Sequence, residues 1–382
     1  MSNDFLKSLS DDEKNRLKSI KETYFKERKD KSLCSFEGFC FLLGAGASTE
    51  AGLPEWDVLV KNLCEKYNLN INVDKNKVIE IVGAIETKII ETMSKKSDYA
   101  QIERYIRHLG HYDEIRRVLY RPEVKRNIAL HVQDLLIDSA KPEEDEKKDL
   151  MNTISKICVE RTCKHLRTSV ITYNYDDYLE YKINNHIEET ALKRANKDKI
   201  KNAIRVHDFS DKQLPCIRQH RCFGTDIYHV HGHLDVFMLT DNDNKTIPSP
   251  GCDEGIILSA DDYLELSEHG VLSWTNQVQH SLLSSMPIIV IGFSMEDANF
   301  RLIIRRLQQA KMMQQHIIMF LGHDGSKEKA KSVETGKVLI RELLRSSNDT
   351  SSADDHDLLK IITCEYENIP NILKYFFSDY FK

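Results

Sequence analysis

The stretch CFLLGAGAS, residues 40–48, followed by Gly52-Leu53-Pro54, decides the fold class of this 382-residue chain. Its apolar run ends abruptly in small residues, as a buried strand does where it enters a tight turn before a helix. Glycine allows close approach of the backbone and a following helix presents N–H groups, so the pattern is typical of a phosphate-binding turn. Thr49 replaces the third glycine of the dinucleotide fingerprint, so a tight turn that binds nothing is an equal alternative.

Apolar runs typical of buried parallel strands recur from residue 169 onward, and helical patterns separate many of them. The strand candidates are 169–172, 227–231, 255–258, 287–292, 317–321 and 361–365. The helix candidates are 262–266, 274–283 and 298–311. Polar segments at 184–226 and 239–254 are predicted to be loops or short helices, and the second is suited to a mobile flap. The alternation predicts an α/β fold with a Rossmann-like, mostly parallel sheet and helices on both faces.

The remaining segments predict the domain organisation. Residues 4–31 are charged and helical in pattern, with Ser10 and Glu13 at capping-box spacing. From 73 to 137 apolar residues recur at intervals of three and four, and 141–146 is a charged break. We expect an N-terminal helical arm over 1–35, a Rossmann-like core over 36–65 and 166–382, and a large inserted helical module over 66–165.

Composition limits the function classes. The formal net charge of −6 provides no overall footprint for nucleic acid. No apolar run reaches the length of a membrane span and the N-terminus is charged, so we expect a cytoplasmic protein without a membrane segment. Nine cysteines without a C-x-x-C pair argue against both a disulfide scaffold and a zinc ribbon.

Polar residues follow two of the predicted strands, where α/β folds place their ligands. In TYNYD, residues 172–176, Asn174 offers a donor and an acceptor and Asp176 accepts hydrogen bonds, which suits ribose hydroxyls and a bound water. An Asx-type turn that ends the strand is the alternative. Farther along, Ser294 follows Gly292, where its hydroxyl or nearby amides could hold a phosphate or an adenine ribose.

The segment YHVHGHLD, residues 228–235, contains three alternating histidines. His231 stands before a glycine at a predicted strand end and can titrate near neutrality, which suits a general base. Because His229, His231 and His233 alternate, a continued strand would place them on one face. A metal-dependent hydrolase using these histidines and Asp235 is therefore a rival hypothesis. Its resemblance to the H-x-H-x-D-H element of metallo-β-lactamases fails at Leu234, and we expect no metal ligands here.

In this order the motifs resemble those of the sirtuin family. Residues 44–48 and 52–54 resemble its NAD loop, and 172–176 resembles its Thr-Gln-Asn-x-Asp motif. His231-Gly232 is similar to its His-Gly pair, and 292–294 to its later cofactor turn. The four-cysteine zinc module of the protein deacylases is missing. Gly-Leu-Pro-x-Trp and the helical insert instead resemble a bacterial sirtuin-like branch found in anti-phage defence.

This resemblance implies an NAD⁺ hydrolase that cleaves the nicotinamide–ribose bond and depletes NAD in anti-phage defence, with NAD as substrate and without zinc. It also implies an ATPase partner, such as one of the HerA type. Because constant NAD hydrolysis would poison the host, we expect restraint by a homo-oligomer, a partner or a closed flap. A protein deacylase or ADP-ribosyltransferase is one alternative, and a non-catalytic NAD or ADP-ribose sensor is another.

The resemblance also implies roles for individual residues. Asn174 would orient water or the ribose hydroxyls, His231 would accept a proton, and Asp176 would fix the loop or bind ribose. The implied cofactor-binding residues are Gly44, Ala45, Gly46, Ser48, Pro54, Thr172, Tyr173, Gly292, Phe293 and Ser294.

Overall fold

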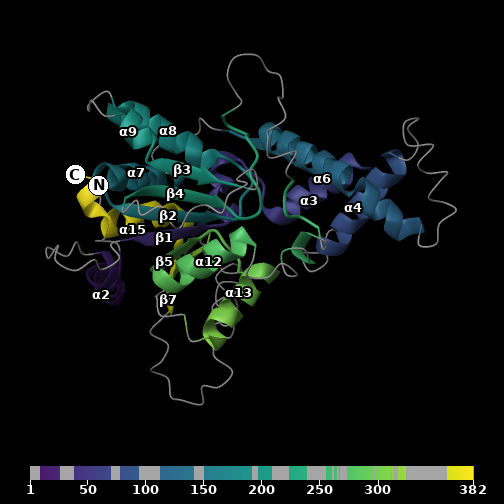
Figure 1. The fold of residues 1–382 in the computed structure, drawn as a ribbon. Coiled ribbons are helices and arrows are strands. Elements are labelled where there is room, and N and C mark those ends of the chain that lie inside the picture. The colour runs from purple at the N-terminus through teal and green to yellow at the C-terminus, as the bar shows by residue number, and fades with distance from the viewer. Residues whose placement is uncertain are drawn as a thin grey trace.

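A seven-stranded, all-parallel sheet forms the centre of the described chain (Figure 1). The computed structural model describes residues 9–25, 38–69, 78–93, 112–141, 150–191, 197–208, 223–238, 255–259, 262–264, 266, 273–295, 297–310, 312, 317–323 and 359–381. The strands are β1 (Phe39–Leu43), β2 (Arg167–Thr172), β3 (Ile204–His207), β4 (Gly224–His229), β5 (Ile288–Ile291), β6 (Ile317–His323) and β7 (Leu359–Glu365). The predicted Rossmann-like α/β fold is confirmed.

The strand order β3-β4-β2-β1-β5-β6-β7 makes β1 the point at which the chain changes direction across the sheet. After β1 the chain builds β2, β3 and β4 on one side, and it then returns to build β5, β6 and β7 on the other. Leu43 at the end of β1 is aligned with Thr172 of β2 and with Ile291 of β5. Open α/β sheets bind ligands outside the carboxyl ends of their strands at such a switch point.

Helices cover both faces of the sheet because successive strand residues point to opposite sides. Phe41 and Leu43 belong to one core cluster, and Cys40 and Leu42 belong to the other. The first face carries α7 (Leu150–Cys163), α8 (Tyr178–Ala191) and α15 (Ile369–Phe376), and the second carries α12 (Trp274–Ser285) and α13 (Ala298–Gln309) (Figure 1).

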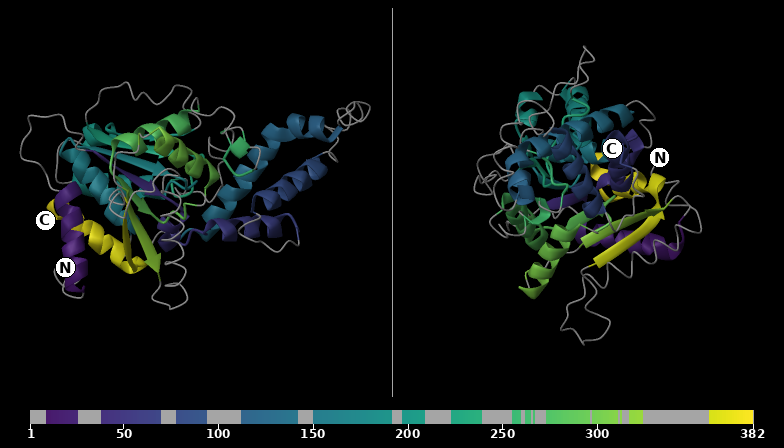
Figure 2. Two further views of the ribbon diagram at one scale, coloured as in Figure 1. Left: turned by 90° about the horizontal axis from the view of Figure 1, so that it is seen from below. Right: turned by 90° about the vertical axis from the view of Figure 1, so that its right-hand side faces the viewer.

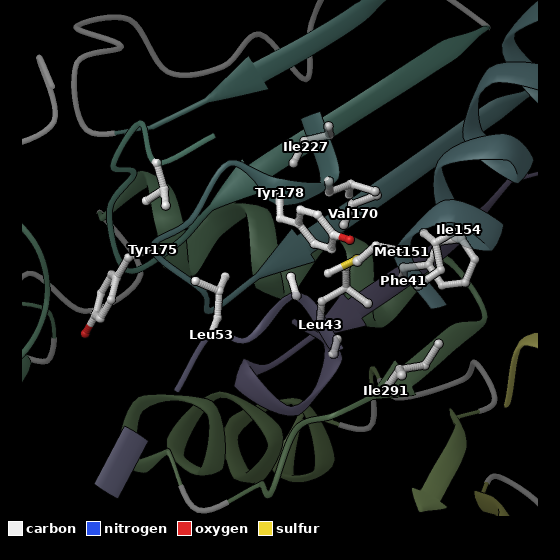
Figure 3. Packing of buried hydrophobic residues seen from close by; sticks show 14 of the residues in the cluster. Phe41, Leu43, Leu53, Met151, Ile154, Val170, Tyr175, Tyr178, Ile227 and Ile291 are labelled. Carbon is white, nitrogen blue, oxygen red and sulfur yellow. The ribbon is translucent and has the colours of Figure 1, made fainter. Parts of the chain in front are cut away.

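Figure 3 shows how the first face is packed. Phe41, Val170 and Ile227 come from three neighbouring strands and meet Met151 and Ile154 of α7. All five side chains are buried. This packing holds the three strands in a fixed arrangement, so the loops that follow them are set relative to one another.

Three helices follow the loop after β1: α3 (Trp56–Lys66), α4 (Val78–Met93) and α6 (Tyr112–Ser139). Helices α4 and α6 pack side by side, and the left view of Figure 2 shows them projecting away from the sheet. Helix α7 falls within the range predicted for the inserted module, but it packs on the sheet against β2, β4 and α15. The predicted domain boundaries themselves stay a prediction.

The N-terminal helix α2 (Asp11–Ile20) continues into a π-helical turn, Lys21–Phe25. The predicted capping box is confirmed: the side chain of Ser10 accepts from the amide of Glu13, and the Glu13 carboxylate accepts from the amide of Ser10. Lys21 Nζ donates to the carbonyl oxygen of Tyr375 at 2.7 Å. The Phe25 ring stacks on Phe376 with centroids 5.1 Å apart, so this part of the arm covers α15.

Two predictions about the middle of the chain are wrong. Residues 255–258 form no strand; the Ile257 amide donates to the carbonyl oxygen of His231 at 2.8 Å instead. Residues 184–226 were predicted to hold only loops or short helices; their described part contains the short helix α9 (Lys197–Lys201), but also the end of α8 and the strand β3, which was not predicted. The strand β3 lies at the sheet edge and carries Arg205, whose guanidinium binds Asp226 at 2.6 Å, so its pattern is not that of an apolar strand.

The strand predicted over 227–231 begins and ends earlier in the chain, because a turn follows His229. Strand β4 ends at His229, and Gly232 adopts a left-handed conformation with φ of +102°. The flap candidate 239–254 and residues 142–146 of the charged break lie outside the described residues. None of the described helices is long and apolar enough to cross a membrane.

Candidate functional site

The loops after β1 and β5 interlock through glycines at the switch point. The Gly44 amide donates to the Ile291 carbonyl oxygen at 3.1 Å, and the Gly46 amide donates to Gly292 O at 3.0 Å. A Cβ on Gly44 would lie 2.5 Å from Gly292 O. Gly292 has φ of +64°, and a Cβ there would lie 2.2 Å from the Ala47 nitrogen. The contact between the two loops therefore requires both glycines, with or without a ligand.

Most main-chain N–H groups of the loop after β1 already donate to carbonyl oxygens of the protein. Besides Gly44 and Gly46, the amides of Ala47 and Ser48 donate to the carbonyl oxygens of Gly44 and Ala45. Two short 3₁₀ turns follow, Ala45–Ala47 and Thr49–Ala51, so α3 begins only at Trp56. The N-terminus of a long helix does not lie directly at this turn, in contrast to a standard phosphate-binding turn.

Asn174 lies at the centre of a hydrogen-bond network between the loops after β1 and β2. Its main-chain N–H donates to Thr172 Oγ1 at 3.1 Å, and its side-chain Nδ2 donates to Ser48 Oγ at 2.9 Å. Ser48 Oγ in turn donates to Asp176 Oδ1 at 3.3 Å. Asn174 Oδ1 is buried and has no hydrogen-bond partner among the described residues. The predicted residues Ser48, Thr172, Asn174 and Asp176 are thus brought together, with one acceptor left over.

Asp176 holds the start of α8 in place. Its Oδ1 accepts from the Tyr178 amide at 3.2 Å. Burial raises the pKa of the Asp176 carboxyl to about 7, and the charges of Asp177 and Glu180 contribute in the same direction. Asp176 is thus hydrogen-bonded to Ser48 and to the start of α8, and with a pKa of about 7 a substantial fraction of this carboxyl is protonated near neutral pH.

His231 lies in the turn after β4, buried beside an aspartate. Its Nε2 is 3.3 Å from Asp297 Oδ2, outside hydrogen-bond geometry. Burial lowers the pKa of His231, which the charges of Asp297 and Asp262 only partly oppose. A neutral imidazole is the form that can accept a proton.

Tyr173 packs between two other predicted residues. Its ring lies 4.7 Å from that of His231 and 4.4 Å from that of Phe293, measured between centroids. Its hydroxyl donates to Gln279 Oε1. Tyr173 is buried, so it supports His231 and Phe293 from within the protein. Ser294, by contrast, is exposed.

Pro54 lies in the connection from the glycine loop to α3. Its neighbour Gly52 has φ of +81°, and a Cβ there would lie 2.6 Å from Ser139 O of α6. The Ala51 carbonyl oxygen accepts from the Lys141 amide at 2.7 Å. Contact with the end of α6 therefore explains the glycine of Gly52-Leu53-Pro54, and no ligand is needed to account for it.

Two aspartates matter to the site in ways that the sequence did not indicate. Asp177 Oδ1 accepts from the amides of Val236 and Phe237, and Oδ2 accepts from Met238, which fixes the loop beyond His231. Asp297 is the N-cap of α13, where its Oδ1 accepts from the Phe300 amide at 2.7 Å. Its approach to His231 depends on tertiary contacts and has no signal in the sequence.

The three alternating histidines do not share one environment. His229 and His233 lie with Glu180 of α8, and their ligand atoms are all within 4.8 Å of one another. His231 instead lies beside Tyr173 and Asp297. The grouping of three histidines with Asp235 fails because β4 ends at His229.

Residues 168–341 match the family model described as the SIR2-like domain. The matched range begins in β2 and includes Asn174, His231 and Gly292, but it does not include residues 44–48. Proteins of this family are generally NAD-dependent enzymes, so the match supports a sirtuin-like domain over these residues and suggests an NAD-related enzymatic function. No curated protein matches the chain.

Proposed function

We propose that this chain is an NAD⁺ hydrolase that cleaves the bond between nicotinamide and ribose. The main supporting observation is the placement of Asn174 and His231. Thr172 of β2 is aligned with His229 of β4, so each proposed catalytic residue follows a paired strand end by two positions. Both are buried, and each has a polar atom without a hydrogen bond among the described residues: Asn174 Oδ1 and His231 Nε2.

The chemistry of the reaction fits these two groups. Nicotinamide leaves NAD⁺ as a neutral molecule, so its departure needs no proton, and positive charge develops on the ribose. The protein must hold the ribose and direct water at its anomeric carbon. In the proposal Asn174 Oδ1 accepts a hydrogen bond from that water or from a ribose hydroxyl. His231 accepts a proton from the same groups, a contribution typically of about 10²–10⁴-fold.

The remaining part of NAD is proposed to lie at the switch point between β1 and β5. Ala45, Gly46 and Gly292 are only half-buried there, and Ser294 is exposed. Because the amides of Gly44, Gly46, Ala47 and Ser48 already donate within the protein, we expect the pyrophosphate to use other donors in this region. The proposal therefore differs from the sequence prediction that the N–H groups of Gly44, Ala45 and Gly46 bind the pyrophosphate, and it gives Gly44 a role in packing against Gly292.

Two alternatives use the same residues differently. A sirtuin-type transferase would pass an acyl group or ADP-ribose to an acceptor, and the missing four-cysteine module in the sequence argues against the deacylase. A non-catalytic NAD sensor would need neither Asn174 nor a buried histidine with an unsatisfied nitrogen. NAD depletion in anti-phage defence, restraint by a homo-oligomer and a HerA-type ATPase partner complete the proposal and rest on the resemblance of the motifs.

The test is release of nicotinamide from NAD⁺ by the purified chain and by the Asn174→Ala and His231→Ala variants. Asn184→Ala and His165→Asn serve as matched controls outside the site. We expect both site variants to stay folded and lose activity, while the controls keep it. Folded site variants that retain activity would refute the assignment. A wild type that binds NAD tightly but stays silent with candidate partners added would instead establish the sensor.

A further inference from the structure

We propose that Glu180, His229 and His233 together hold a divalent metal ion, and that Zn²⁺ is the ion their chemistry fits best. The three residues come from α8, from the end of β4 and from the turn after it. Their ligand atoms lie within 4.8 Å of one another. Two imidazole nitrogens and one carboxylate oxygen form a ligand set that Zn²⁺ commonly takes. This inference does not rest on the proposed NAD hydrolysis.

The orientation of His229 leaves Nε2 available for a cation. Its Nδ1 lies 3.2 Å from the main-chain oxygen of Asn174, and a carbonyl oxygen can only accept, so Nδ1 carries the proton. Nε2 lies 2.6 Å from Glu180 Oε1. In the neutral ring Nε2 would then point a lone pair at a carboxylate, which is repulsive. A second proton on the ring or a metal ion between the two groups removes the conflict.

In His233, as in His229, Nδ1 faces a supporting group and Nε2 is the atom proposed to bind the ion. The Nδ1 atom of His233 lies 3.4 Å from Asp208 Oδ2, and its Nε2 is buried without a hydrogen-bond partner in the described part of the chain. Histidines that bind metals almost always donate their other N–H to a carboxylate or a backbone carbonyl. In His233 the supporting group is the Asp208 carboxylate, and in His229 it is the main-chain carbonyl of Asn174.

Glu180 provides the third open position. It is buried, and although Oε1 pairs with His229, Oε2 has no hydrogen-bond partner among the residues that the structure describes. A buried polar atom left unpaired typically costs about 1–3 kcal/mol. One ion bound by Glu180 and His233 would satisfy both unpaired atoms, whereas a proton on His229 satisfies neither.

The charge of the surroundings also favours a cation. Four carboxylates make the field at His233 negative: Asp208, whose Oδ2 lies 3.4 Å from His233 Nδ1, and Glu180, Asp235 and Asp177. The same negative field would attract a metal ion. The ion would join α8 to the end of β4 and, through His229, support the backbone of Asn174 without touching the substrate.

The experiment uses the full chain, stripped with a chelator and desalted, with Zn²⁺ or Co²⁺ alone as the probe. Elemental analysis should find one Zn²⁺ per chain after reloading and removal of free metal, and Zn²⁺ should raise the unfolding temperature. Glu180→Gln and His233→Gln should each weaken binding at least about tenfold, and Asp208→Asn, which changes only the supporting group, by about 10–100-fold. His186→Gln is the matched control, a histidine on α8 that lies 3.4 Å from Glu189, and should bind as the wild type does.

Wild type that takes up no stoichiometric metal and shows no shift in unfolding temperature would overturn the proposal and establish a purely hydrogen-bonded Glu–His cluster. Metal content unchanged in the folded variants would also overturn it, because the ion would then lie elsewhere. If the Glu180 and His233 variants do not fold, Asp208→Asn and the visible absorption of the Co²⁺-loaded wild type decide. A visible spectrum of bound Co²⁺ that shows no nitrogen ligands would count against the site.

Discussion

The Nδ1 atom of His229 lies 3.2 Å from the main-chain oxygen of Asn174, which connects the last residue of β4 to the loop after β2. On its other side Asn174 donates to Ser48 in the loop after β1. Three neighbouring strand ends therefore position one asparagine. The Oδ1 atom of Asn174 has no hydrogen-bond partner in the described chain, so this support leaves an acceptor for a ligand.

Replacing Asp297 with asparagine should reduce NAD⁺ hydrolysis by about tenfold or more, because the charge beside His231 helps orient the imidazole and stabilise it once protonated. Asp297 Oδ1 caps α13 and Oδ2 accepts from the Tyr263 hydroxyl at 2.8 Å. Asparagine is also a good N-cap, so the unfolding free energy should change little. The measurement is kcat and KM together with urea unfolding.

Asp297→Ala is the companion variant, since it removes the cap as well as the charge. It should lose about 1 kcal/mol of stability in addition to the activity. An Asp297→Asn variant with unchanged kcat would show that the 3.3 Å approach to His231 has no role in the reaction.

Replacing Gly44 with alanine should destabilise the protein by about 3 kcal/mol or prevent folding, because the new methyl group would meet backbone atoms that cannot move freely. The Cβ would lie 2.5 Å from Gly292 O and 2.7 Å from Phe293 Cα. Gly83→Ala in α4 is the matched control. Nothing lies within 4 Å of its Cβ position, so this change should stabilise the helix by about 0.5–1 kcal/mol. Urea unfolding measures both, and a stable Gly44→Ala protein that only bound NAD more weakly would contradict the packing role.

Asp176→Asn should stabilise the protein at pH 8 relative to the wild type, and much less at pH 5. The pKa of Asp176 rises on folding from 3.8 to about 7 because the carboxyl is buried, so the folded protein binds this proton more tightly than the unfolded chain does. The wild type therefore loses stability as the pH rises from about 4 to about 7, and asparagine has no such loss. The difference should be on the order of a few kcal/mol above pH 7. Unfolding free energies at the two pH values measure it, and a difference that is equal at both or larger at pH 5 would contradict the burial effect.

The predicted architecture depended on patterns that are local in the chain. The apolar run before Gly44 and the one before Gly292 identified β1 and β5, because strands buried on both faces are continuously apolar. The edge strand β3 was missed for the same reason, since Arg205 and His207 face Asp226 and interrupt the pattern. Residues 255–258 were mistaken for a strand because a short apolar run can be buried without pairing in a sheet.

The sequence by itself determined the parallel α/β core, the glycine turns and the polar residues that follow the strands, because local patterning and turn chemistry are written in consecutive residues. Only the tertiary structure decided what those residues contact. It assigned Gly44 to packing against Gly292, grouped His229 with Glu180 and His231 with Asp297, and left Asn174 Oδ1 unsatisfied. These relationships join residues far apart in the chain, and they depend on strand order and on where β4 ends, which no local pattern specifies.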